Sequence, residues 1–160
     1  MNQFRIAADS SCNLLTLNGA DFVSVPLTIR TETEEFRDDA SLDVDAMVST
    51  LRSTRGRSYS ACPNVADWES AFGESGDVIA FTITSSLSGS YNAACVGREM
   101  VLERSPEKKI HIFDSESASA GETLIALMLR DRIDGGHSFE DIVAEMTAFI
   151  ARMKTRFVLE

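Results

Sequence analysis

Short apolar runs alternate with amphipathic stretches along the whole chain, and this alternation constrains the fold more than any other feature of the sequence. The apolar runs lie at residues 4–8, 22–29, 77–84, 109–113 and 156–159. Strands that are covered on both faces have continuous apolar sequences of this kind. Strands that are separated by helical stretches are typical of a parallel sheet with crossover helices. We therefore predict an α/β fold with an open, mostly parallel sheet and helices on both faces.

The amphipathic stretches carry residues that begin and end helices. We predict helices at residues 42–51, 64–72, 91–102, 120–133 and 138–153. Caps precede three of them, namely Ser41, Asn64 with Asp67, and Ser138 with Asp141. Gly135 and Gly136 are expected to end the fourth helix, and Pro26 to end the second strand or lie at a sheet edge. No internal repeat or linker interrupts the pattern, so residues 1–160 are predicted to form a single domain.

The charge of the chain excludes several classes of partner. The 160 residues are 44% hydrophobic, which is enough for one core. The 15 basic and 25 acidic side chains give a formal net charge of −10 (15 minus 25). This charge repels phosphate backbones and anionic lipid surfaces within a Debye length. We therefore expect no nucleic-acid partner, and since no apolar run approaches membrane-spanning length, no stable membrane insertion.

The cysteines indicate a reducing compartment. Cys12, Cys62 and Cys95 are far apart, odd in number and without a Cys-x-x-Cys pair, so they predict neither a disulfide framework nor a zinc site. Residues 1–8 contain no apolar run long enough for a signal peptide. We therefore predict a soluble protein of the cytoplasm.

No pattern in the sequence predicts a metal site. The acidic residues between positions 32 and 45 lack the Asp-x-Asp-x-Asp-Gly order of a calcium loop, so a solvated face or a hairpin is favoured there. His111 and His137 have no second histidine or cysteine at metal-ligand spacing. We interpret both histidines as structural.

Serine residues are concentrated where three predicted strands end. The first strand is followed by Asp9-Ser10-Ser11, the third by residues 84–90 and the fourth by residues 114–119. In a doubly wound sheet, ligands bind at the carboxyl ends of the strands, beside helix N-termini that attract anions. Any single loop of this kind would be explained by helix capping alone. Three loops that converge on one edge predict a binding site.

The segment Leu87-Ser88-Gly89-Ser90 is the most informative of these loops. Gly89 permits close backbone approach, and Ser88 offers a hydroxyl and an N–H group to an oxyanion. The glycine patterns of Walker and dinucleotide-binding loops are absent, so nucleotide binding is not predicted. The hydrolase pattern Gly-x-Ser-x-Gly is absent around Ser88, and the phosphatase pattern Asp-x-Asp is not formed by Asp9-Ser10-Ser11. A binding protein without catalytic residues is predicted, and the alternatives are a small hydrolase or phosphatase using Asp9 or Ser88, and a ligand-free interaction module.

Several of these segments together resemble the DegV family. The matching segments, in order, are Phe4-Arg5-Ile6-Ala7-Ala8-Asp9-Ser10-Ser11, Val25-Pro26-Leu27, Ser88-Gly89-Ser90-Tyr91 and Ile112-Phe113-Asp114-Ser115-Glu116-Ser117-Ala118-Ser119. Ser60-Ala61-Cys62-Pro63 is similar to the family's Thr-Ser-x-Pro element, although one hydroxyl is lost and a cysteine is introduced. Lys154-Thr155-Arg156 resembles the entry to the next strand of the family.

The resemblance implies a bacterial protein that binds a long-chain fatty acid and uses no cofactor. In that family the acyl tail lies in an apolar tunnel, and the bound acid is presented to a separate fatty acid kinase that phosphorylates the carboxylate for phospholipid synthesis. Carried over to this sequence, the ligand-binding residues are Ser60, Ala61, Ser88 and Gly89. The supporting residues are Asp9, Ser10, Ser115 and Ser117.

The resemblance covers only the N-terminal domain of the family. The family continues for roughly another hundred residues in a second domain, which is the size of an ordinary small domain. We therefore expect residues 1–160 to be a DegV-like N-terminal domain whose second domain is missing. Apolar surface that the second domain covers in the family is then exposed, and self-association through that surface is expected.

Overall fold

The continuous apolar runs form the strands of a central parallel sheet, because both of its faces are covered. The computed structural model describes residues 4–73 and 76–156. The order of strands in this sheet is β2-β1-β6-β7, and every neighbouring pair is parallel. The strands are β1 (Arg5–Asp9), β2 (Asp21–Val25), β6 (Val78–Thr82) and β7 (Ile110–Asp114). The predicted α/β class with an open parallel sheet is confirmed.

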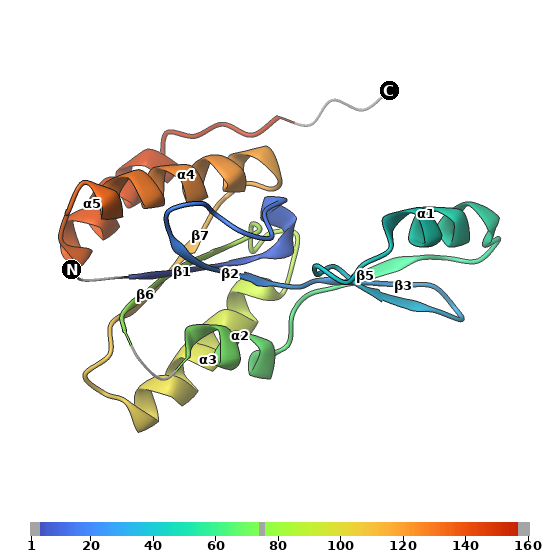
Figure 1. The fold of residues 1–160 in the computed structure, drawn as a ribbon, viewed down its shortest axis with the longest axis horizontal. Coiled ribbons are helices and arrows are strands. Elements are labelled where there is room, and N and C mark those ends of the chain that lie inside the picture. The colour runs from blue at the N-terminus through green and yellow to red at the C-terminus, as the bar shows by residue number, and fades with distance from the viewer. Residues whose placement is uncertain (1–3, 74–75, 157–160) are drawn as a thin grey trace.

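Helices cover the two faces of the sheet in pairs (Figure 1). One pair is α2 (Val65–Phe72) with α3 (Ser90–Arg104), and the other is α4 (Ala120–Asp134) with α5 (Phe139–Ile150). Successive residues of a strand point to opposite faces, so the core divides into two clusters. Ile6 and Phe81 pack with residues of α4 and α5, whereas Ala7 and Ala80 pack with residues of α2 and α3.

Most of the predicted helix ends are confirmed. Asn64 and Asp67 form a reciprocal capping box at the start of α2, and the Ser138 hydroxyl accepts the Asp141 N–H at the start of α5. Gly135 caps the C-terminus of α4, and Gly136 follows with a φ of 75°. The last helix ends at Ile150, three residues before the predicted end.

The predicted N-cap at Ser41 is wrong. Helix α1 (Val44–Ser53) is capped by Asp43, whose carboxylate accepts the Ala46 N–H. The Ser41 hydroxyl and N–H bond instead to the Asp39 carboxylate. Both serine and aspartate are good caps, so local preference alone did not distinguish Ser41 from Asp43.

A second, smaller sheet was not predicted. The run at 22–29 is two strands, because β2 ends at Val25 and Pro26 separates it from the next strand. The small sheet is antiparallel with the order β4-β3-β5, and consists of β3 (Thr28–Arg30), β4 (Glu35–Arg37) and β5 (Tyr59–Ala61). The acidic stretch forms the β3–β4 hairpin and the exposed region after it, as the hairpin interpretation predicted.

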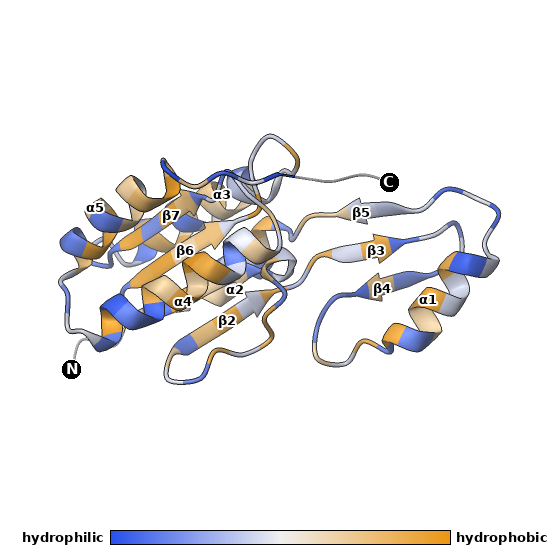
Figure 2. Cartoon of the chain, turned by 90° about the horizontal axis from the view of Figure 1, so that it is seen from above, coloured by the Kyte–Doolittle hydropathy of each residue, from blue (hydrophilic) through white to orange (hydrophobic). Residues whose placement is uncertain are grey.

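The small sheet and α1 form a separate lobe that extends beyond one end of the central sheet (Figures 1 and 2). No residue of α1 or of the three strands is fully buried within the described part of the chain. By contrast, all five residues of β6 are buried. The final predicted strand, residues 156–159, lies almost entirely outside the described residues, and Arg156 itself has no regular structure.

Across residues 4–73 and 76–156, none of the helices combines the length and the apolar character that crossing a membrane requires.

Candidate functional site

Hydrogen bonds join the serine loops at the carboxyl ends of β1, β6 and β7. The Ser90 hydroxyl donates to Asp9 Oδ2 at 2.6 Å, which joins the loop after β6 to the end of β1. The Thr84 N–H donates to the Ser117 carbonyl at 2.9 Å, which joins the loops after β6 and β7. Parallel strands bring their carboxyl ends to one edge, and the predicted convergence of these three loops is therefore confirmed.

Asp9 is the buried centre of this edge. Its side chain has no solvent exposure, and its oxygens accept from the Ser11 hydroxyl at 2.6 Å, the Ser90 hydroxyl at 2.6 Å and the Ile83 N–H at 3.1 Å. Burial raises the pKa of this carboxyl, and the three donors partly oppose that rise. A carboxylate without exposure cannot reach a phosphate ester in solution, so this geometry disfavours the phosphatase alternative.

Glu122 is a second buried carboxyl that the sequence did not identify as part of the site. It has no solvent exposure, and its Oε2 lies 2.5 Å from the Ser11 hydroxyl and accepts the Ser119 N–H at 3.0 Å. Burial, followed by the negative charge of Asp9, raises the pKa of Glu122 to about 8. Its signal in the sequence was the capping-box pattern Ser119-x-x-Glu122, which identifies the start of α4 but not the burial.

The Ser88-Gly89 turn leads directly into α3. The Ser88 hydroxyl accepts the Ser90 N–H at 3.2 Å, and Ser88 remains partly exposed. Gly89 has a φ of −76°, so the turn does not require a glycine for its backbone conformation. A Cβ at Gly89 would lie 3.3 Å from Cys62 Sγ, so the two residues are in close contact and a larger residue at position 89 would require the sulfur to shift.

That contact places the end of β5 against the start of α3. Ser60 pairs with Ile29 of β3 and is exposed, Ala61 is half-buried, and Cys62 follows at the strand end. The hydroxyl of Ser88, the N-terminus of α3 and the end of β5 therefore form one surface. The structure gives no direct contact between Ser60 and Ser88, and their joint action remains a prediction.

The predicted supporting serines stabilise the loops themselves. The Ser10 hydroxyl accepts the Leu27 N–H at 3.0 Å, which ties the end of β1 to the crossing between the two sheets. The Ser115 hydroxyl accepts the Ser117 N–H at 3.1 Å, and the Ser117 hydroxyl lies 2.6 Å from that of Thr155. All three serines are buried, and their hydrogen bonds hold the loops in shape.

Among residues 4–73 and 76–156, neither histidine forms a hydrogen bond with a serine. His111 packs edge-on against Phe113, and His137 Nδ1 lies 3.2 Å from Glu145. Within the described ranges, no three His, Cys, Asp or Glu side chains cluster as metal ligands would.

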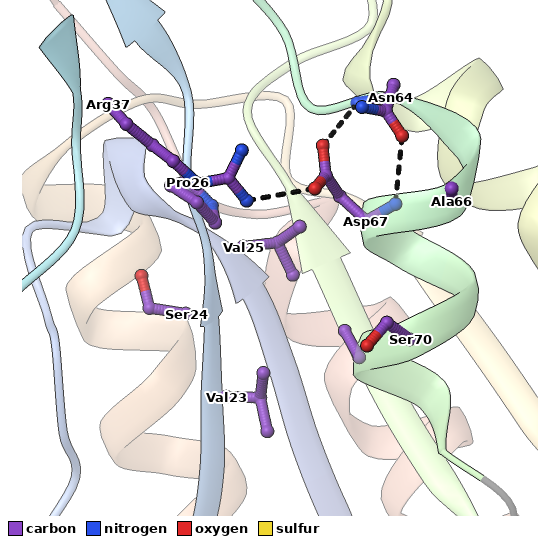
Figure 3. A pocket seen from close by; sticks show the side chains of 10 residues that line it. Val23, Ser24, Val25, Pro26, Arg37, Asn64, Ala66, Asp67 and Ser70 are labelled. Carbon is purple, nitrogen blue, oxygen red and sulfur yellow. Dashed lines mark hydrogen bonds and ion pairs between the residues drawn. The ribbon is translucent and has the colours of Figure 1, made fainter.

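Two open pockets flank the crossing between the sheets. The first, of about 330 Å³, lies between β2 and the start of α2, and its cation Arg37 is already paired with Asp67 at 2.9 Å (Figure 3). The second, of about 290 Å³, lies beside Ser10. It is lined by Leu14, Leu15, Leu42 and Val44 together with Ser10, Asn13, Asp38, Asp39 and Ala40. Leu15 and Val44 are 51% and 55% exposed, so this pocket has unburied apolar walls.

The sequence and the fold are both similar to known DegV proteins. The model of the DegV family, described as a family of uncharacterised proteins, matches residues 3–160. A DegV domain-containing protein of Streptococcus pneumoniae is 42% identical over 160 residues, which cover 98% of this chain and 57% of that protein. The chain thus spans little more than half the length of that relative.

Two crystal structures share the fold. One is a DegV family protein from Eubacterium eligens loaded with heptadecanoic acid, with a TM-score of 0.90, 39% identity, and 93% of this chain and 54% of that one covered. The other is the Fatty Acid Kinase (Fak) B3 protein of Streptococcus pneumoniae loaded with linoleic acid, with a TM-score of 0.89, 42% identity, and coverages of 92% and 54%. With a family match over nearly the whole sequence and a fold shared with these relatives, the chain belongs to the DegV family.

Proposed function

We propose that this chain binds a long-chain fatty acid and holds its carboxylate at Ser60, Ala61, Ser88 and Gly89 without making or breaking bonds. The observation that carries the proposal is the contact of Gly89 with Cys62, which brings the end of β5 beside the N-terminus of α3. A helix N-terminus and a free hydroxyl attract a carboxylate over a few ångströms, where the distant surface charge is screened. The fatty acids bound to two relatives of 39% and 42% identity support the same ligand class.

The acyl tail is proposed to account for most of the affinity. Each methylene removed from water stabilises the complex by about 0.8 kcal/mol, whereas the carboxylate contacts set the orientation. The apolar walls of the pocket beside Ser10 offer part of the surface against which a tail packs. In the cytoplasm of a bacterium, the bound acid would then be presented to a fatty acid kinase, as the name of the Fak B3 relative suggests.

Replacing Ser88 by alanine is expected to weaken palmitate binding by about tenfold to a hundredfold, because a hydrogen bond to a charged group contributes about 1.5–3 kcal/mol. The matched control is Ser86→Ala, which removes an exposed hydroxyl from the same loop. Isothermal titration measures the affinity, and native mass spectrometry of the protein from bacteria detects a retained acyl chain. The wild type, but not Ser88→Ala, should also supply acid to the kinase. Equal affinities for the two variants would contradict the proposed carboxylate site.

Alkylation of Cys62 is expected to abolish fatty-acid binding. Cys62 is exposed and its sulfur lies against Gly89, so an added carboxamidomethyl group would occupy the surface where the carboxylate is proposed to bind. Cys12 is buried, and burial raises its pKa to about 12, so it does not compete for iodoacetamide. In the Cys62→Ser variant the same treatment should leave palmitate binding intact. Unchanged binding by the alkylated wild type would place the carboxylate elsewhere.

A further inference from the structure

The Ser11 hydroxyl lies between two carboxyl groups and has only one hydrogen to donate. Its oxygen is 2.6 Å from Asp9 Oδ1 and 2.5 Å from Glu122 Oε2. Both separations are hydrogen-bond distances, and each requires a hydrogen between the two oxygens. If both carboxyls were ionised, one of the two pairs would bring lone pairs together with no hydrogen between them. The geometry therefore requires a second proton, carried by one of the carboxyls.

The surrounding donors show which carboxyl carries it. Asp9 accepts from the Ile83 N–H, the Ser90 hydroxyl and the Ser11 hydroxyl, which is the environment of an ionised carboxylate. Glu122 receives a backbone donor at Oε2 only, and its Oε1 is buried without a hydrogen-bond partner. An ionised carboxylate with an unsatisfied buried oxygen is costly, so the proton belongs on Glu122.

We propose that Glu122 is a neutral carboxylic acid at neutral pH and acts as a positioning residue for the Ser88-Gly89 turn. With this proton, Glu122 donates to the Ser11 oxygen 2.5 Å away, and Ser11 donates its own hydrogen to Asp9. Asp9 also accepts from Ser90, which is the first residue of α3. The chain of hydrogen bonds thus runs from the start of α4 to the start of α3. The effect of this hydrogen-bond chain on ligand binding rests on the proposed carboxylate site. The protonation of Glu122 does not depend on that proposal.

Burial and the charge of Asp9, which faces Glu122 from the end of β1, make the ionisation of Glu122 unfavourable. Cys12 faces it from the 3-10 turn Ser10–Cys12 as a neutral thiol, because burial raises its pKa to about 12. Loss of the proton would place a second negative charge behind the turn that receives the carboxylate. Two like unit charges roughly 12 Å apart at an effective dielectric constant of about 20 change an affinity by about tenfold. Binding should therefore weaken as the pH rises through the pKa of Glu122.

Infrared spectroscopy tests the proton without any ligand. At pH 7 the wild type should show the C=O stretch of a buried, protonated carboxyl, which should disappear as the pH is raised. The band should be absent from Glu122→Gln and retained in Glu116→Gln, which alters an exposed carboxyl on the loop before α4. If Glu122→Gln does not fold, titration of the wild-type band still gives the answer. A wild type without the band at pH 7 overturns the proposal.

The pH profile of palmitate binding tests the positioning role. From pH 7 to pH 9, the affinity of the wild type and of Glu116→Gln should fall about tenfold relative to that of Glu122→Gln, since two charges at this range have about that effect. Any change in the ionisation of palmitate between pH 7 and pH 9 affects all three proteins equally. The difference between their profiles therefore reports on Glu122 alone. Parallel profiles for the wild type and Glu122→Gln overturn the positioning role. If the infrared band is present but the protein binds no fatty acid at any pH, the protonation of Glu122 is supported and the proposed function is contradicted.

Discussion

An Asp9→Ala variant should lose about 3 kcal/mol of the free energy of unfolding, together with its fatty-acid binding. The substitution leaves the Ile83 N–H and the Ser90 hydroxyl buried without their acceptor, and each unsatisfied buried group costs about 1–3 kcal/mol. It also disconnects Ser90 from β1, so the turn before α3 is no longer held in place. Urea denaturation followed by far-UV circular dichroism measures the stability, and titration with palmitate measures binding.

Asp9→Asn provides the matched control for this experiment. It keeps the shape of the side chain and one acceptor oxygen, so it should lose less stability than Asp9→Ala. The amide cannot accept all three donors, and some loss is still expected. If Asp9→Ala were destabilised by less than about 1 kcal/mol, which is the size of an ordinary hydrogen bond, the buried network would not be the centre of this edge.

Truncation of Trp68 to alanine should cost about 3–5 kcal/mol, as for other large buried aromatic residues. Trp68 has no solvent exposure, its ring centroid is 5.7 Å from that of Phe72, and it packs against α3 at Gly97. The cavity would lie between α2, α3 and the central sheet. Because Trp68 is the single tryptophan of the chain, unfolding must be followed by circular dichroism instead of intrinsic fluorescence.

Trp68→Phe should be far less destabilising than Trp68→Ala. The indole Nε1 is buried without a hydrogen-bond partner, so phenylalanine removes an unsatisfied donor as well as some volume. These effects oppose each other, and the net loss should be about 1–2 kcal/mol, well below the cost of the alanine cavity. Equal losses for the two variants would mean that the site tolerates no change of shape at all.

The position of the candidate site was predictable because it follows from the parallel sheet. Asp9, Ser88 and Ser117 each follow a strand of that sheet, and the carboxyl ends of parallel strands share an edge. The roles of individual side chains were not predictable. Ser117 is buried and bonded within the loops, whereas Ser88 remains partly exposed. Both are serines after strands, and only the packing around them distinguishes the buried loop support from the exposed hydroxyl that is proposed to bind the ligand.

The small antiparallel sheet was missed for a related reason. Its strands have three residues each, which is too short for a periodic pattern to stand out from the neighbouring turns. Ser60 was assigned to the site through the family resemblance. The sheet contains Ser60 in β5, and Cys62, which follows that strand, lies close to Gly89.

The class of the fold, the ends of most helices and the edge at which the serine loops gather were all predictable from the order of the residues. These features depend on local periodicity, on capping residues and on the shared direction of parallel strands. Folding brings Glu122 beside Ser11, 111 residues away in the chain, and buries the carboxyls of both Asp9 and Glu122, which no local pattern predicted. The charge of an acid depends on its solvation and on its neighbours in space, and neither is encoded in the residues that adjoin it along the chain.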